Sequence, residues 1–211
     1  MFNNFRIGDV CMWLKTALMT VIMFCCSIAS QGMIIHNYCE DIEDGKLIEE
    51  GNYDEDYLFL GNELNFKGNS EDLLFFGKKL EFGGSTKLGI ISFGKTINVS
   101  GTAGNGVIAG GKKIQITGII TGNNFIGAKS ITIDGNSKVN GNLFTACDIM
   151  AVSGVVNGDI YAAGRELLIN NEIKGDVKFY GKKIVFGENG KISGNLTYAA
   201  RNRVTKKDSE K

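Results

Sequence analysis

Lysine and arginine recur at a regular spacing through most of the chain, and they are the residues whose type and position suggest a chemical role. From residue 78 onward, a basic residue stands at the same place in successive segments about 17 residues long, with one interruption at Asp148. We call this set the basic column; its members are Lys78, Lys95, Lys112, Lys129, Arg165 and Lys182. A row of cations can bind an anionic envelope polymer or lipid headgroups. The same row can also be a solvated face that discourages edge aggregation, and the spacing leaves both interpretations open.

Catalytic chemistry has little support in the sequence. The 211 residues include a single histidine, His36, and contain no Cys-x-x-Cys, no His-Glu-x-x-His and no glycine-rich phosphate loop between a strand and a helix. Only Cys39 and Cys147 lie outside the N-terminal hydrophobic segment, which is too few cysteines for a disulfide framework. We therefore expect no enzyme, no metal and no cofactor. The equal numbers of basic and acidic residues, 23 of each, also argue against a nucleic-acid partner.

A repeat positions the basic column. Nine times, an Asp, Asn or Gly is followed five residues later by a Gly, Ala or Cys, as in Asp159/Gly164 and Asp176/Gly181, and most steps between repeats are 17 residues. Three residues past the second anchor the side chain is apolar in almost every repeat, as at Ile114, Ile131 and Met150. Further apolar positions alternate with polar ones, which is the pattern of strands with one buried face. Each repeat thus offers three short strands separated by Gly, Asn and Asp.

Three strands in 17 residues cannot bury a core alone, so each repeat must pair with the next. The sequence predicts an all-β parallel β-helix of about eight coils, roughly 40 Å long at 4.8 Å per coil, following an N-terminal hydrophobic helix. Stacked Asn and Asp are expected to bond along one corner. An antiparallel sandwich, the main competitor, does not explain columns that stay in phase over nine repeats.

Several units of the repeat resemble those of bactofilins, the polymer-forming cytoskeletal proteins of bacteria. They are "NGNLFTACDIMAV", "NGDIYAAGRELLI", "KGDVKFYGKKIVF" and "SGNLTYAARNRV". The resemblance covers roughly residues 56–204, and the Gly-Asp-apolar corner of that family falls on Gly158-Asp159-Ile160 and Gly175-Asp176-Val177. It implies a right-handed β-helix that stacks end to end into filaments without nucleotide, often at a membrane.

The N-terminus differs from that family. Residues 1–30 resemble a signal peptide or a membrane anchor, because Thr16 to Ser30 carries no charge and Ser27-Ile28-Ala29 offers a cleavage site. Residues 31–55 form an acidic lead or N-terminal cap, 56–204 the repeat domain and 205–211 a polar tail. We therefore expect an exported protein, periplasmic or on the cell surface, whose N-terminal segment is either cleaved or retained as an anchor.

The ends of such a rod present open strand edges, which polymerise unless they are capped. Aromatic residues near both ends are candidate contacts between subunits: Tyr57, Phe59, Phe75 and Tyr198. An outward apolar patch at Ala151, Leu168 and Val185 is either a lateral contact or covered by the tail. Two hypotheses follow. The first is a scaffold protein of the cell envelope that assembles with itself by stacking coils, and the second is a monomeric module that holds an anionic glycan or lipid through the basic column.

Overall fold

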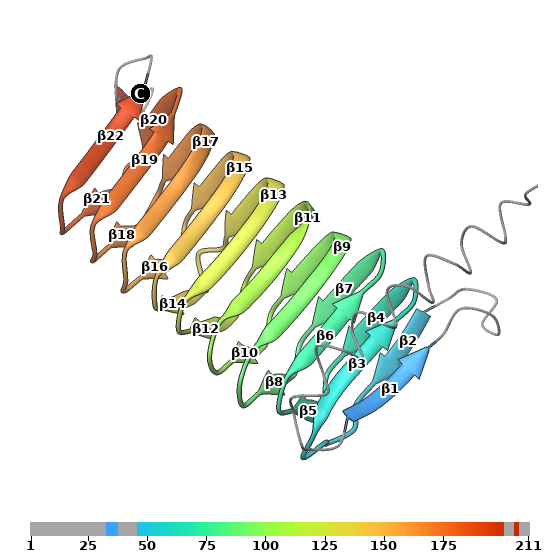
Figure 1. The fold of residues 1–211 in the computed structure, drawn as a ribbon. Coiled ribbons are helices and arrows are strands. Elements are labelled where there is room, and N and C mark those ends of the chain that lie inside the picture. The colour runs from blue at the N-terminus through green and yellow to red at the C-terminus, as the bar shows by residue number, and fades with distance from the viewer. Residues whose placement is uncertain (1–32, 38–45, 201–204, 207–211) are drawn as a thin grey trace, which may run out of the picture. The chain divides into compact units, whose positions relative to one another are not determined.

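A computed structural model describes residues 33–37, 46–200 and 205–206. This part of the chain is all β and forms a solenoid of parallel strands with about nine turns (Figure 1). The predicted signal peptide or anchor at residues 1–30 lies outside the described residues. Two compact units divide the chain at Gly32, and the solenoid belongs to the second, Met33–Lys211. The predicted β-helix architecture is therefore confirmed.

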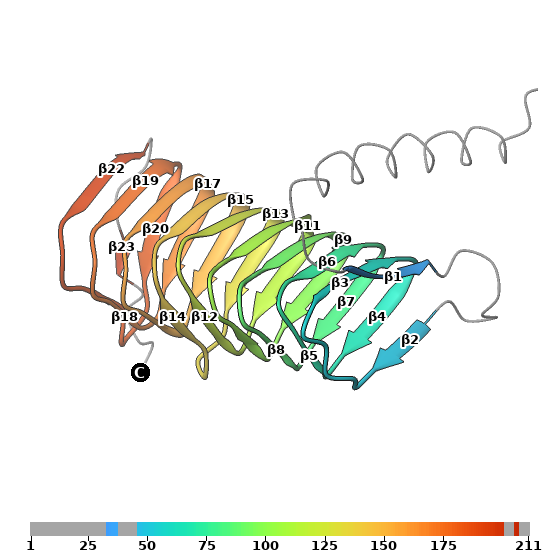
Figure 2. The ribbon, with the colours of Figure 1, turned by 60° about the horizontal axis from the view of Figure 1, so that its bottom comes forward.

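Each coil has three sides, which Figures 1 and 2 show from two directions. The first face contains β1 (Met33–Asn37), β3 (Asp56–Leu60), β6 (Leu73–Phe76), β19 (Val177–Gly181), β22 (Leu196–Ala200) and the first halves of five ten-residue strands, β9 (Ile90–Val99), β11 (Val107–Ile116), β13 (Asn124–Ile133), β15 (Leu143–Val152) and β17 (Ile160–Ile169). The second face contains β2 (Lys46–Glu49), β4 (Glu63–Phe66), β7 (Lys79–Phe82), β20 (Lys183–Phe186), β23 (Thr205–Lys206) and the second halves of those five strands. The third face is a separate sheet of β5 (Asn69–Ser70), β8 (Ser85–Thr86), β10 (Thr102–Ala103), β12 (Ile119–Thr121), β14 (Lys138–Asn140), β16 (Val155–Val156), β18 (Glu172–Ile173) and β21 (Lys191–Ile192).

The core runs through the middle of the rod as stacks of equivalent residues. Ile114 pairs with Ile131, and Ile131 pairs with Met150, and all three side chains are buried. The alternation of β13, buried at every second residue at both ends, is that of a strand with one face inside. The predicted single interior stack is confirmed. Both insertions form turns outside it, closed by hydrogen bonds from the backbone N–H of Ser137 to Asp134 and of Gly190 to Gly187.

Asp and Asn side chains connect the coils at the corner that precedes the first face. The Oδ1 atoms of Asn142, Asp159 and Asp176 accept hydrogen bonds from the backbone N–H of the equivalent residue one coil later, at 2.9, 2.8 and 2.7 Å. These bonds satisfy backbone donors where the chain turns between strands. The expected bonding along this corner column is confirmed, and its main partner is the backbone.

The solenoid begins earlier than the repeat domain predicted from residue 56. Strand β1 pairs with β3 in register from Met33↔Asp56 to Asn37↔Leu60, and β2 pairs with β4. Both strands lie in the segment 31–55 that the sequence assigns to an acidic lead or cap. That segment therefore contributes a coil of its own, although its acidic residues hide the apolar alternation.

Candidate functional site

The basic column stands on the corner between the first and second faces. In the pairing of β9 with β11 the register passes from Gly94↔Gly111 to Thr96↔Lys113, so Lys95 and Lys112 fall outside the ladder. The backbone still connects the coils there, because the N–H groups of Lys95 and Thr96 both donate to the carbonyl of Lys78, at 2.8 and 3.0 Å. A corner residue points its side chain away from both sheets. All six members of the basic column are exposed.

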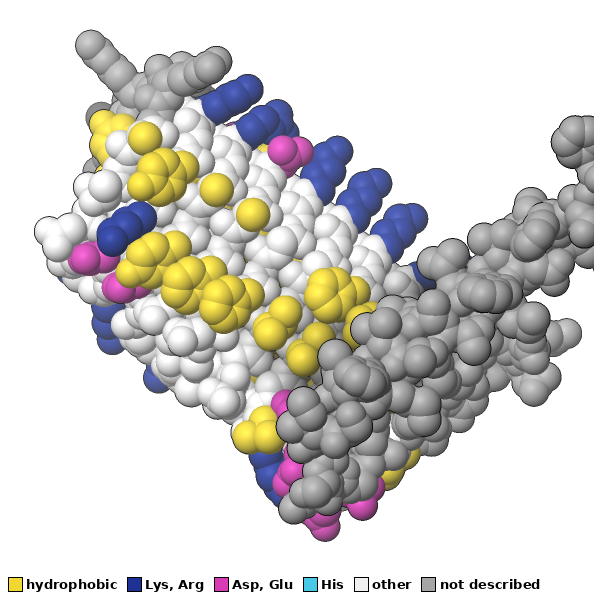
Figure 3. All heavy atoms as spheres, in the orientation of Figure 1, with side chains coloured by type: hydrophobic (Ala, Val, Ile, Leu, Met, Phe, Trp, Pro, Cys, Tyr) yellow, Lys and Arg dark blue, Asp and Glu magenta, His cyan; other side chains and the backbone are white. Residues whose placement is uncertain are grey.

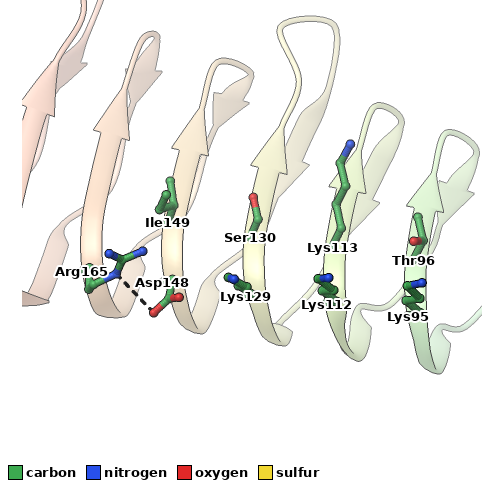
Figure 4. A pocket seen from close by; sticks show the side chains of 9 residues that line it. All are labelled: Lys95, Thr96, Lys112, Lys113, Lys129, Ser130, Asp148, Ile149 and Arg165. Atoms are coloured by element: carbon green, nitrogen blue, oxygen red, sulfur yellow. Dashed lines mark ion pairs between the residues drawn. The ribbon is translucent and has the colours of Figure 1, made fainter.

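Four members of the basic column line one open groove of about 400 Å³, shown in Figure 4. The groove follows β9, β11, β13, β15 and β17 along the start of the second face. Its lining residues are Lys95, Thr96, Lys112, Lys113, Lys129, Ser130, Asp148, Ile149 and Arg165. Lys113 stands beside the column on the second face, and its role was missed because it occurs in one coil only. Lys78 and Lys182 continue the column beyond the groove, at either end.

The charges in this groove are mostly uncompensated. The structure shows one ion pair among the lining residues, from Arg165 Nε to Asp148 Oδ1 at 3.4 Å (Figure 4). Lys95, Lys112, Lys113 and Lys129 have no carboxylate within 4 Å among the described residues. Neighbouring coils are about 4.8 Å apart, so these ammonium groups repel one another, and salt screens the repulsion. An extended anion with repeated charges would relieve it, which is the chemistry that this arrangement can perform.

Cys147 lies under Asp148 at the same corner. Burial raises the pKa of the Cys147 thiol to about 11, and the negative charge of Asp148 raises it further in the same direction. The thiolate is the nucleophile and the metal ligand, so a thiol held neutral is a poor candidate for either role. In the part of the chain that the structure describes, no cluster of three or more His, Cys, Asp or Glu side chains is placed to hold a metal ion.

Three of the four predicted end contacts lie inside the rod. Tyr57, Phe59 and Phe75 are fully buried, and the rings of Phe59 and Phe75 stack with centroids 5.7 Å apart. The coil formed by β1 and β2 precedes them, so they are core residues and offer no surface to another subunit. Tyr198, on the last coil, is 47% exposed.

Tyr198 occupies an inward-facing position with no later coil above it among the described residues. It pairs with Phe179, which is buried in the preceding coil. Leu196 and Ile192 of the same coil are only partly buried. Strand β22 is the last strand along the first face and β1 is the first, so each has one free edge within the described residues.

The outer side of the first face carries apolar residues that the sequence analysis overlooked. They form two rows, which we call the outer apolar columns. One contains Leu74, Ile91, Ile108, Phe125, Phe144 and Tyr161, and the other contains Phe76, Phe93 and Tyr180, with Gly and Ala between them. The available signal was an apolar residue directly after each inward one. By contrast, Val185 of the predicted outer patch is 8% exposed and pairs with Thr205 of β23, in agreement with cover by the tail.

The described residues include no helix that is both long and apolar enough to cross a membrane. Comparison of the chain with protein-family models, with curated proteins and with solved structures finds no match.

Proposed function

We propose that the protein is a non-catalytic structural scaffold of the cell envelope, bactofilin-like, that assembles by end-to-end stacking of its coils. The resemblance of the repeats to bactofilins supports this proposal and implies a right-handed coil. The N-terminal sequence, with its uncharged stretch from Thr16 to Ser30, supports export and either cleavage or anchoring. N-terminal sequencing of the protein from its native cells distinguishes these two fates.

One observation carries the proposal: the coil stack stops at both ends with strand edges open among the described residues. All pairings along the first face are parallel and in register, so β22 of one molecule presents the edge that β1 of the next can continue. Such a head-to-tail contact does not close on itself, and it generates a linear filament. The partly exposed Ile192, Leu196 and Tyr198 would then be covered as the equivalent residues of earlier coils are.

Electron microscopy of the purified chain tests the proposal. We expect filaments that persist at high salt, because backbone pairing and apolar contact are less sensitive to screening than surface charge is. Tyr198→Asp should abolish them, because it places a charge on the end layer. Tyr180→Asp is the matched control, since Tyr180 is 64% exposed but faces outward on the preceding coil. Monodisperse single rods of the unaltered chain at all salt concentrations would overturn the proposal.

A second candidate function is favoured by the unpaired lysines of the groove. In this alternative the protein is a monomeric surface-binding module that holds an anionic glycan or lipid along the basic column. Binding of alginate, a polyuronate, should then weaken steeply with salt and fall in the double variant Lys112→Gln/Lys129→Gln. The double variant Lys138→Gln/Lys174→Gln removes the same charge elsewhere on the rod, where both lysines are exposed, and should bind normally.

A further inference from the structure

The outer apolar columns form a face without a partner among the described residues. Figure 3 shows them as rows of hydrophobic side chains along the rod. Phe93, Ile108 and Phe125 are each close to half exposed, from 44 to 50%. Gly110, Gly127, Ala146 and Ala163 fill the spaces beside them, so the face has few large projections. Contiguous apolar surface of this kind on a soluble domain marks a contact site.

The aromatic rings in these columns are arranged edge-outward. Phe125 stacks on Phe144 with ring centroids 4.8 Å apart and planes 10° apart, and Phe144 stacks on Tyr161 at 4.9 Å and 6°. The rings therefore cover one another's faces along the rod. Lys178 Nζ covers the end of the row, 5.2 Å from the Tyr161 ring centroid. Because the ring faces are already in use, stacking of sugar rings on them is disfavoured.

The basic column borders this face along one edge. Lys112 and Lys129 follow directly after the small residues Gly111 and Ala128 that end the first-face strands. Figure 3 shows the cations as a row projecting beside the apolar side chains. An apolar surface edged by lysine and arginine matches the boundary between acyl chains and anionic headgroups, where aromatic and aliphatic side chains enter the bilayer and cations meet phosphate.

We infer that the first face docks on the surface of an anionic lipid bilayer, with the outer apolar columns at the acyl boundary and the basic column on the headgroups. Lys178 and the hydroxyl groups of Tyr161 and Tyr180 favour a bilayer over a second copy of the chain. Lys178 stands in the middle of the apolar area, where a dry protein interface would have to desolvate its charge. At a lipid interface its ammonium group can extend back to water or phosphate.

The course of the chain agrees with this orientation. The uncharged stretch Thr16–Ser30 ends three residues before β1, which is the first strand of the same face. A segment that inserts in a membrane would therefore join the solenoid on the docking face. The inference does not depend on end-to-end stacking, because a single rod carries the whole surface.

Sedimentation of the full chain with large unilamellar vesicles tests the inference. The probes are vesicles of phosphatidylcholine alone and vesicles with about one third phosphatidylglycerol. We expect at least tenfold tighter binding to the anionic vesicles. Phe93→Asp/Phe125→Asp should weaken that binding at least tenfold, and Lys112→Gln/Lys129→Gln should remove most of the preference for anionic lipid. Every variant keeps the N-terminal segment, so differences between them report on the face.

The controls separate this face from the rest of the rod. Ile119→Asp changes a 43% exposed residue of the third face, and Lys138→Gln/Lys174→Gln removes equal charge away from the basic column. Both should bind like the unaltered chain. Equal binding by Phe93→Asp/Phe125→Asp and Ile119→Asp would overturn the inference, and so would a dimer that Phe93→Asp/Phe125→Asp dissociates while vesicle binding is absent. Electron microscopy of the same samples reports stacking separately, so either proposal can fail alone.

Discussion

The Oδ1 atom of Asn124 accepts a hydrogen bond from the backbone N–H of Val107, at 3.0 Å, inside the rod. In the neighbouring coils the equivalent N–H donates to a backbone carbonyl, as Ile90 does to Gly106 and Leu143 does to Asp159. Asn124 is fully buried, and its Nδ2 group donates to the carbonyls of Gly122 and Asn142. A polar side chain thus completes the ladder at the one coil where the backbone does not.

Replacement of Asn124 by leucine should destabilise the protein, although leucine suits the apolar column. The Val107 N–H would remain buried without an acceptor, which costs about 1–3 kcal/mol in the free energy of unfolding. Urea denaturation measures the loss. Ile90→Leu, at the same position of an earlier coil, should cost less than about 1.5 kcal/mol. Similar losses for both variants would show that the hydrogen bond of Asn124 adds nothing.

Gly106 should not tolerate alanine. Its φ is +103°, and an added Cβ would lie 2.4 Å from the carbonyl oxygen of Asn123. Both the backbone strain and the contact act against alanine, so we expect Gly106→Ala to lower the free energy of unfolding by about 1–3 kcal/mol. Gly127→Ala provides the comparison, because a Cβ there meets nothing within 4 Å. Thermal melts that place both variants at the same temperature would contradict the geometry.

Asp72→Asn should stabilise the protein at neutral pH. Burial raises the pKa of Asp72 above 3.8; the Gly89 N–H opposes the shift, and the charges of Asp56 and Glu71 add to it. The folded state therefore binds this proton more tightly than the unfolded state. Asp72 contributes most to stability below pH 3.8, and that contribution is lost as the pH rises through its folded-state pKa.

The neutral amide avoids this loss and still offers an acceptor, as Asn142 does in its own bond to Asp159. The melting temperature of Asp72→Asn should thus exceed that of the unaltered chain at pH 7 and lose this advantage near pH 3. The same gain at both pH values would mean that the charge of Asp72 is not its cause.

Cys147 should react slowly with alkylating agents. With a pKa of about 11, set by burial and then by Asp148, almost none of it is thiolate at pH 8. We expect iodoacetamide to modify it about 100-fold more slowly in the folded protein than in urea, where the pKa returns to its usual range. Mass spectrometry of the peptide that contains Cys147 measures the rate separately from the other cysteines. Comparable rates in both conditions would disprove the protection.

The stack of Ile114, Ile131 and Met150 could be predicted because a parallel solenoid keeps equivalent residues in phase. The coil formed by β1 and β2 could not, since its acidic residues obscure the alternation and its spacing differs from 17. The role of Asn124 depends on the positive φ of Gly106 and Gly122 on either side of it. No sequence pattern reveals that local geometry.

The basic column was predictable as a row, but its grouping with Lys113 and Ile149 depends on where the corner lies between two sheets. Phe125 and Phe144 were overlooked because an apolar residue after an inward one is equally compatible with core packing. Tyr57 and Phe59 were misplaced at an end because the preceding coil was not recognised. Position along the chain was predictable, whereas position relative to the surface was not.

The corner bonds of the Asp and Asn column all run in one direction. In each, the oxygen belongs to the earlier coil and the N–H to the later one, as from Asp159 to Asp176 and from Asp176 to Asn195. The rod is therefore a polar object, with acceptor oxygens directed toward its C-terminal end. A filament of such rods would inherit that polarity, and its two unlike tips would gain and lose subunits at different rates.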